Sequence, residues 1–436
     1  MGDKLPPRIL VLSVGGSCAP VVNACREYKP DFIYFFCSGG PKGSTVAVDG
    51  EGDPCGDSRT IKCPKCKTEI PLGNNPKGES IVRQLQLPPG SYEKVEVDDP
   101  DDLASCYRKL VDLENRIRER FGPDAEVIAN YTGGTKTMSV ALALLAALRE
   151  GWDLSVNIGP RFDLIKVRGG DHAVFADKQV VAAELYRSQA AEFLRSYAYD
   201  TADKVLSQLT TRYRLSSDLR DRFLRIRLLC QAFYAWDVFD HRKALELLRL
   251  VGGEKVAPYI EVALGLAGEK KKVTGYEPVM DLLLNAERRT EQGRYDDAVA
   301  RLYRALEMTA QVRLRQAWNL DTGNLALDQL PPELRDKHLP WQDEKGRIRL
   351  GLVKSFELLA ELNDPVGQLW RQQESKMRNA LEARNSSILA HGTVPLSEAS
   401  YRQYGSVIGG FIEEVFQLTG VRLPRRQLPR EELLDM

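Results

Sequence analysis

The feature of the sequence that most constrains its fold is a change of pattern near residue 178. From residue 8 to about residue 176, short runs rich in β-branched and aromatic residues alternate with segments of helical length. Such alternation is typical of an α/β layer with a mostly parallel sheet. After residue 178 the strand-like runs stop, and apolar residues recur at helical spacing. The sequence therefore predicts an α/β domain followed by an all-α half.

The individual elements can be placed within this pattern. Six runs are predicted to be strands: residues 8–14, 31–38, 92–97, 126–132, 153–158 and 163–169. Helices are expected at residues 19–28, 103–121 and 138–149. A Gly- and Lys-rich segment at 265–278 indicates a boundary within the helical half, where a helical bundle is favoured over a solenoid. We divide the chain into three parts, residues 1–177, 178–275 and 276–436.

Charge and hydropathy narrow the classes of function. Among 436 residues, 61 Lys and Arg balance 61 Asp and Glu, which argues against a protein that coats nucleic acid through a basic face. The longest apolar stretch, Val140–Leu148, is far shorter than the roughly 20 residues of a membrane span, and the N-terminus lacks the apolar core of a signal peptide. We therefore expect a cytoplasmic protein without a membrane partner, in which most cysteines are reduced.

Two glycine-containing loops follow predicted strands. Residues 132–136 read Thr-Gly-Gly-Thr-Lys and precede a helix, and the loop at 13–20 contains Gly15 and Gly16. A helix N-terminus carries unpaired N–H groups and partial positive charge, and glycine lets the backbone approach an anion closely. The spacing differs from that of a P-loop, in which glycine directly precedes lysine. Because both loops can lie at the carboxyl edge of the sheet, they favour a crevice for a phosphate-containing ligand over two simple turns.

The pair of motifs, VGGS after the first strand and TGGTKTMS after a later one, resembles the CARF domain of CRISPR-associated accessory proteins. The resemblance covers about residues 8–176. It implies a Rossmann-like domain that dimerises and binds, at its two-fold axis, a cyclic oligoadenylate made by the type III interference complex. By this resemblance the ligand crevice is lined by Gly15, Gly16, Ser17, Thr132, Gly133, Gly134, Thr135 and Lys136, with Ser38 and Gly39 as further candidates.

Residues 40–80 interrupt the α/β pattern and contain three clustered cysteines. Cys63 and Cys66 have the spacing of a zinc knuckle, and Cys55 lies upstream of them. A structural zinc ion would explain how so polar a segment is ordered. No histidine is present, so the fourth ligand would be Cys37, an acidic residue or a residue of a partner chain. The alternative is three free thiols in a mobile loop, and the sequence leaves both open.

An arginine and a histidine near the C-terminus have a spacing suited to RNA cleavage. Arg384 precedes His391 by seven residues, close to two turns of an unbroken helix, so both side chains would share one face. RNA supplies its own nucleophile, the 2′-OH. Its cleavage needs proton transfer, which histidine provides near neutral pH, and stabilisation of phosphate charge, which the arginine fork provides. This reaction needs no metal ion. From the spacing alone, a surface pair without function is favoured, because one Arg and one His at helical spacing often occur by chance.

The segment RNSSILAH, residues 384–391, resembles the R-x(4–6)-H motif of HEPN ribonucleases, in which a polar residue often follows the arginine. Residues 285–311 also resemble the first helical hairpin of this domain in CARF-HEPN proteins. The resemblance implies a composite cleft formed by the Arg-His pairs of two chains. It assigns proton transfer to His391, phosphate stabilisation to Arg384 and a supporting role to Asn385. The arginine-rich tail after residue 420 is expected to be solvated.

These features predict a homodimeric endoribonuclease of the CARF-HEPN kind. It would cleave single-stranded RNA without a metal ion when a cyclic oligoadenylate binds to the first domain. The alternative is a ligand-sensing interaction or regulatory protein in which the pair Arg384 and His391 is incidental.

Overall fold

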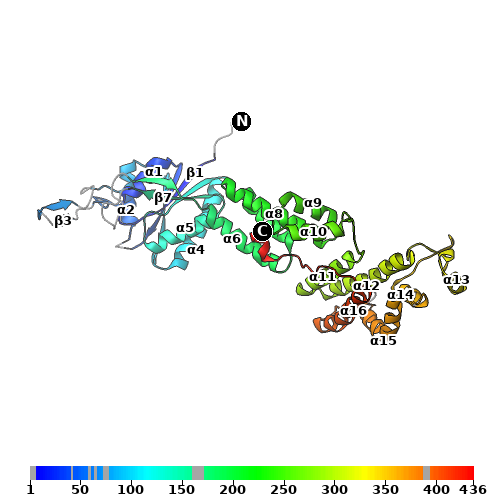
Figure 1. Cartoon of the computed structure of the whole chain (residues 1–436). Helices are drawn as coiled ribbons and strands as arrows, with labels where there is room; N and C mark the ends of the chain where they lie inside the picture. The colour runs from blue at the N-terminus through cyan, green and yellow to red at the C-terminus, as the bar shows by residue number, and fades with distance from the viewer. Residues whose placement is uncertain are drawn as a thin grey trace. The chain divides into compact units, whose positions relative to one another are not determined.

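The computed structural model describes residues 6–40, 43–56, 60–62, 66–71, 78–159, 171–385 and 393–436 (Figure 1). The chain divides into two compact units. Unit 1 comprises Met1–Leu185 and Thr211–Ser216, and unit 2 comprises Tyr186–Thr210 and Ser217–Met436. Each unit is considered by itself below. Among the residues that are described, no helix is long and apolar enough to cross a membrane.

Unit 1 is built on a six-stranded sheet. Its strands are β1 (Arg8–Ser13), β2 (Phe32–Ser38), β5 (Tyr92–Val97), β6 (Glu126–Asn130), β7 (Trp152–Ile158) and β8 (His172–Phe175). They lie in the order β5-β2-β1-β6-β7-β8, and all neighbours are parallel except β7 and β8. The predicted α/β domain with a mostly parallel sheet is thereby confirmed. The strand expected at residues 163–169 lies outside the described residues.

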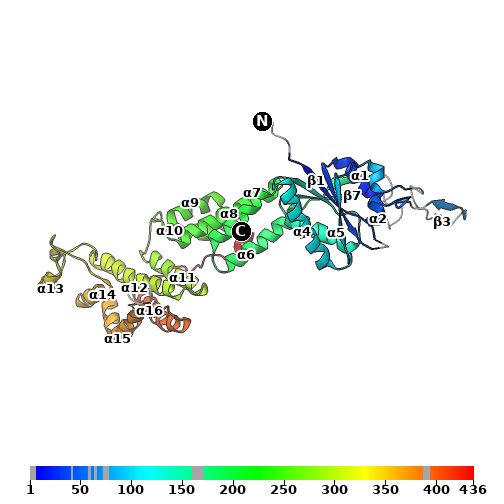
Figure 2. The same ribbon diagram turned by 180° about the vertical axis from the view of Figure 1, so that it is seen from behind.

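Helices cover both faces of this sheet (Figure 2). They are α1 (Ala19–Tyr28), α2 (Thr45–Asp49), α3 (Ile81–Leu85), α4 (Leu103–Phe121) and α5 (Lys136–Leu148). Side chains alternate between the two faces along a strand. Ile9 and Val11 of β1 therefore pack with α4 and α5, whereas Leu10 and Leu12 pack with α1, α2 and α3. Because β1 is buried on both sides, its middle residues, 9–12, form an uninterrupted apolar run.

The segment between β2 and β5 departs from the α/β pattern, as predicted. Besides α2 and α3, it contains the antiparallel hairpin of β3 (Thr60–Lys62) and β4 (Glu69–Pro71). Cys63 lies outside the described residues. Within the described ranges, no group of three or more His, Cys, Asp or Glu residues could hold a metal ion.

A disulfide in this segment corrects the prediction for its cysteines. Cys55 is bonded to Cys18, which precedes α1. A sulfur atom in a disulfide is not a thiolate, and the thiolate is the form that binds zinc. The assignment of Cys55 as a zinc ligand beside Cys63 and Cys66 is therefore wrong, and zinc is not supported. Cys18 and Cys55 are exceptions to the expectation that most cysteines are reduced, whereas the buried Cys25, Cys37, Cys106 and Cys230 form no disulfide.

Replacing both Cys18 and Cys55 with serine should lower the free energy of unfolding by about 2–4 kcal/mol. The reason is that the disulfide joins residues 37 positions apart and restricts the unfolded chain. Urea denaturation of the two proteins measures the difference. A reductant should lower the stability of the wild-type protein to that of the variant and leave the variant unchanged. A wild-type protein that is indifferent to reductant would contradict the disulfide.

The described part of the chain after residue 178 is helical, as predicted, apart from one pair of two-residue strands, β9 (Leu325–Ala326) and β10 (Arg347–Ile348). Its α-helices are α6 (Gln179–Arg195), α7 (Tyr199–Arg212), α8 (Ser217–Asp237), α9 (His241–Val251), α10 (Ala257–Leu266), α11 (Glu277–Glu291), α12 (Tyr295–Trp318), α13 (Pro332–His338), α14 (Leu352–Glu361), α15 (Pro365–Asn385) and α16 (Glu398–Thr419).

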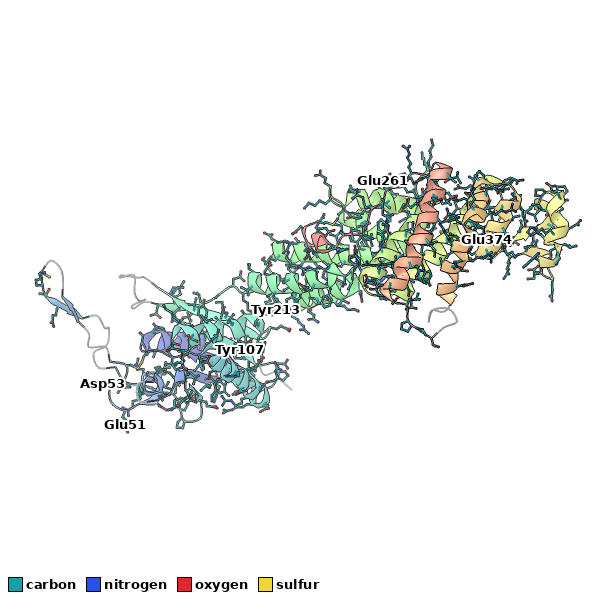
Figure 3. All side chains as sticks on the ribbon, turned by 90° about the horizontal axis from the view of Figure 1, so that it is seen from below. Glu51, Asp53, Tyr107, Tyr213, Glu261 and Glu374 are labelled. Atoms are coloured by element: carbon teal, nitrogen blue, oxygen red, sulfur yellow. A yellow bond between two sulfur atoms is a disulfide. The ribbon has the colours of Figure 1, made fainter. Side chains whose placement is uncertain are left out.

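An aromatic cluster fixes the last helices of unit 2 around α12, which packs against α11, α14, α15 and α16. Phe356 of α14 stacks on Trp370 of α15 with ring centroids 4.4 Å apart, and Phe411 of α16 meets both rings edge-on. Along α15, Glu374, labelled in Figure 3, pairs with Arg378 at 2.7 Å. This packing positions α15, the helix that carries the predicted catalytic arginine.

The C-terminal tail is packed, so the expectation of a solvated tail is wrong. The tail ends in a 3-10 helix, η3 (Glu431–Asp435), which contacts α8. Leu433 and Leu434 in this turn are buried. Arg430 pairs with Glu291 of α11. Apolar burial and ion pairing therefore hold the tail against the helices of unit 2.

Candidate functional site

The two glycine loops of unit 1 meet at the carboxyl edge of the sheet. β1 and β6 are parallel neighbours, so the loops that follow them emerge side by side. A Cβ atom on Gly15 would lie 2.7 Å from the backbone nitrogen of Gly134, and one on Gly133 would clash with the carbonyl oxygen of Ser13. Ser13 Oγ also donates a hydrogen bond of 2.7 Å to the carbonyl oxygen of Gly133. The two backbones therefore touch, and only glycine fits at the contact.

The second loop leads directly into α5. Thr135 caps this helix, because its Oγ1 accepts a hydrogen bond of 3.2 Å from Met138 N and donates one of 2.6 Å to Pro100 O. The cap starts α5 at Lys136 rather than at the predicted Met138. The Thr135 hydroxyl is thus used to shape the loop, whereas the Lys136 side chain is exposed.

The remaining predicted crevice residues fall into two groups. Gly16 and Ser17 are exposed in the loop after β1. Ser38 exchanges hydrogen bonds with Ser44, and Gly39 donates one to the end of β5. The structure therefore brings the two glycine loops together and places Ser38 at the end of β2 and Gly39 directly after it.

A buried polar network supports the second loop, and the sequence analysis missed it. Asn157 N of β7 donates to Thr132 Oγ1 at 2.7 Å, and Thr132 Oγ1 donates to Asn157 Oδ1 at 3.2 Å. Asn130 Nδ2 donates to the same Oδ1 at 2.9 Å and to Ser155 Oγ at 2.9 Å. Asn157 Nδ2 donates to Asp171 Oδ2 at 2.7 Å. The sequence indicates this network only through two polar residues, Ser155 and Asn157, within the predicted strand at 153–158.

We expect Asn157→Ala to lower the free energy of unfolding of unit 1 by about 1–3 kcal/mol, because it removes hydrogen bonds from Asn130 and Thr132. Urea denaturation followed by the fluorescence of Trp152, the only tryptophan of unit 1, measures this change. Asn115→Ala, exposed on α4, is the control, with an expected change within about 0.5 kcal/mol. Equal changes in both variants would show that the network does not stabilise the loop.

The second candidate site lies between α15 and α16 in unit 2. The backbone of α15 ends at Asn385, so Arg384 and Asn385 belong to its last turn. The side chains of these two residues, and the whole of His391, lie outside the described residues. The shared helical face of Arg384 and His391 therefore stays a prediction.

The chain is fixed on both sides of this segment. Ala380 and Leu381, in the last part of α15, are buried in the core of unit 2. After the segment, Leu396 N donates a hydrogen bond of 3.0 Å to Asp296 Oδ2 in the first turn of α12. Ser397 then caps α16 with its side chain. The predicted catalytic segment is thus anchored by three helices, α12, α15 and α16.

Two other histidines of unit 2 have structural partners. His241 Nε2 lies 2.9 Å from a buried carboxylate of α11, and His338 Nε2 lies 2.7 Å from Glu361 Oε2. Burial by itself would raise the pKa of Glu361. The hydrogen bonds from Lys337 and His338 lower this pKa by more than burial raises it, so the pKa lies below its usual value. The Glu361 carboxylate therefore holds His338 in place. In unit 1, His172 is exposed on β8.

Comparison with known sequences bears on the second site. Residues 268–414 match the family model described as the Csm6 HEPN domain. The matched range includes α11, α12, α14, α15 and the segment from Arg384 to His391. No curated protein matches the sequence significantly.

Comparison with solved structures bears on the whole chain. Its fold is similar to that of Enterococcus italicus Csm6 bound to cyclic hexa-2'-fluoro-hexa-dAMP, with a TM-score of 0.62 and 12% sequence identity. The alignment covers 98% of this chain and 97% of that chain. The predicted resemblance to CARF-HEPN accessory proteins of type III CRISPR systems is confirmed, and so is the fold class, an α/β domain followed by a helical half that ends in a HEPN domain.

Proposed function

We propose that this chain, with the fold of a CARF-HEPN protein, is an endoribonuclease of type III CRISPR antiviral defence that cleaves single-stranded RNA when a cyclic oligoadenylate binds. The observation that carries the proposal is the Csm6 HEPN match over the segment containing Arg384 and His391. The cyclic oligoadenylate in the structurally similar Csm6 supports the class of activator.

The activator would bind where the two glycine loops meet. A Cβ atom on Gly16 would meet no other atom within 4 Å, so the first loop has open space beside it for a phosphate. The N-terminus of α5 offers unpaired N–H groups with partial positive charge. Lys136 adds a full charge at the same point. We assign residues 15–17 and 132–136 to the crevice, with Ser38 and Gly39 at its edge.

The cleavage reaction would follow from the chemistry of RNA. The 2′-OH attacks the adjacent phosphorus, and the 5′-oxygen of the next nucleotide leaves. His391 would transfer the protons that this exchange requires, since imidazole both gives and takes protons near neutral pH. Arg384 would stabilise the charge that develops on the phosphate oxygens, and Asn385 would support it. No step requires a metal ion.

An exposed apolar stripe on α5 supports a homodimer. Val140, Leu144 and Leu148 are 48%, 44% and 39% exposed and four residues apart, so they lie on one face of the helix. The helix starts at the proposed crevice. A contiguous apolar face of this kind marks an association surface. We propose that a second copy of the chain covers it, and that two HEPN domains then form one composite cleft.

If the apolar stripe of α5 is the dimer interface, a charged residue placed on it should weaken the dimer. We expect Leu144→Lys to shift the protein toward the monomer, because a buried, unpaired ammonium group is costly at an apolar interface. Size-exclusion chromatography with light scattering measures the mass. Leu250→Lys, at an exposed leucine of α9, is the control and should leave the mass unchanged. A monomeric wild-type protein at the same concentration, or a dimer that tolerates Leu144→Lys, would contradict this interface.

The three functional parts proposed are a sensing domain at 1–177, connecting helices at 178–275 and a nuclease domain at 276–436. The start of the family match at residue 268 supports a boundary close to residue 275. We propose that the protein acts in the cytoplasm.

The catalytic assignment is tested by His391→Ala. Loss of the proton-transferring group should reduce RNA cleavage by about 10²–10⁴-fold. The rate is measured with labelled single-stranded RNA in EDTA, in separate reactions with cyclic tetra-adenylate and cyclic hexa-adenylate. Cleavage by the wild-type protein should be unaffected by EDTA.

His172→Ala, at an exposed histidine of β8, is the control and should keep wild-type activity. If His391→Ala cleaves RNA as fast as the wild-type protein, another residue performs the proton transfer. If the wild-type protein binds a cyclic oligoadenylate and leaves RNA intact, the alternative of a ligand-sensing interaction protein is favoured.

A further inference from the structure

Unit 2 contains a cavity of about 630 Å³ that the proposed mechanism does not use. It is lined by residues of the turn between α6 and α7, the end of α8, the end of α11 and the start of α12. Its volume is within the range of about 300–1,000 Å³ that ligand sites occupy. Its wall contains three arginines, Arg289, Arg294 and Arg301, and two acidic residues, Asp200 and Asp237.

The acidic residues of the wall already have cationic partners. Asp237 is buried, pairs with Arg289 and accepts a hydrogen bond of 2.7 Å from Arg288 Nε. One carboxylate therefore serves two guanidinium groups. Asp200 pairs with Lys204 at 3.2 Å. The charge of Asp237 is therefore compensated by arginines, and Asp200 has a cationic partner at the surface.

The other two arginines of the wall share a single carboxylate. Asp297 pairs with Arg294, and its Oδ1 lies 3.5 Å from Arg301 Nη1. Burial lowers the pKa of Arg301, Asp297 raises it, and the charges of Arg289 and Arg294 lower it, with a net lowering. Positive charge is thus concentrated at the cavity, and an anion there would stabilise it.

The cavity shares the first turn of α12 with the catalytic segment. Asp296, next to Asp297, accepts the hydrogen bond from Leu396 N, five residues after His391. The ring of Tyr295, at the start of the same turn, lies 6.1 Å from the ring of Tyr401 in α16. One helical turn therefore carries carboxylates that contact both the cavity arginines and the chain that follows the catalytic histidine.

We infer that this cavity binds the phosphodiester backbone of the substrate RNA. The inference rests on the proposed function, because it assigns the ligand as the RNA that the HEPN domain cleaves. The planar guanidinium groups of Arg294 and Arg301 match phosphate oxygens. Tyr234, 45% exposed and also in the wall, offers an aromatic face on which a base can stack. Arginines that bind phosphates and a tyrosine that stacks on a base form a combination suited to single-stranded RNA.

The test measures RNA binding without cleavage. Fluorescence anisotropy of a short labelled single-stranded RNA is recorded with full-length His391→Ala protein over a series of salt concentrations. Arg294→Gln and Arg301→Gln, each added to this background, should weaken binding roughly tenfold. Each should also make the slope of log affinity against log salt shallower by about 0.7, the value for one lost phosphate contact on a single strand.

Arg304→Gln is the matched control, because Arg304 is an exposed arginine of the same helix that pairs with Glu307 and is not in the cavity wall. It should leave affinity and slope unchanged. An equal loss in Arg304→Gln would mean that any positive charge on α12 suffices, which overturns the inference. Unchanged binding in Arg294→Gln overturns it as well, and since that side chain is largely exposed, the variant is not expected to unfold the protein.

Two further outcomes separate the possible failures. Competition by adenosine monophosphate as strong as that by RNA would identify a mononucleotide site and overturn the inference. Failure of the wild-type protein to cleave RNA, with binding still dependent on Arg294 and Arg301, would overturn the proposed function and leave the RNA site standing.

Discussion

A contact between two backbones, those of the loops after β1 and β6, organises unit 1, the proposed sensing domain. Because the two strands are parallel neighbours, their carboxyl ends lie together, and a side chain at Gly15 or Gly133 would push the loops apart. The N-terminus of α5 follows this contact directly, so a phosphate bound there would meet unpaired N–H groups and the charge of Lys136. The buried network around Asn157 keeps the second loop in position from behind.

In unit 2, the first turn of α12 has a comparable role. It anchors the chain after the proposed catalytic segment through Asp296, and through Asp297 it holds two arginines of the proposed RNA site. Binding of RNA and positioning of the catalytic segment would then depend on the same helix. A cyclic oligoadenylate can control this arrangement only if it binds the active state more tightly than the inactive state, and the difference in binding free energy sets the degree of activation.

The sequence predicted the features that depend on local pattern. Strand β1, helix α4 and the two glycine loops follow from hydrophobic periodicity and from the position of glycine between strand and helix. The features it missed depend on partners far away in the chain. The closeness of Cys63 and Cys66 in sequence makes Cys55 a candidate zinc ligand or a free thiol, whereas its partner is Cys18 in the first loop. The packing of the tail was missed for the same reason. Its arginines pair with acidic residues of α11, which lie more than 130 residues earlier in the chain, and a local pattern does not show such partners.

The central claim is that a ligand bound to unit 1 controls RNA cleavage by unit 2. The most direct measurement is the rate of cleavage of labelled single-stranded RNA by the wild-type protein in EDTA, as cyclic tetra-adenylate or cyclic hexa-adenylate is added in increasing concentration. We predict a rate near zero without ligand and a saturable increase with at least one of the two rings. A rate that is the same with and without ligand, at concentrations where the ring is bound, would contradict the claim.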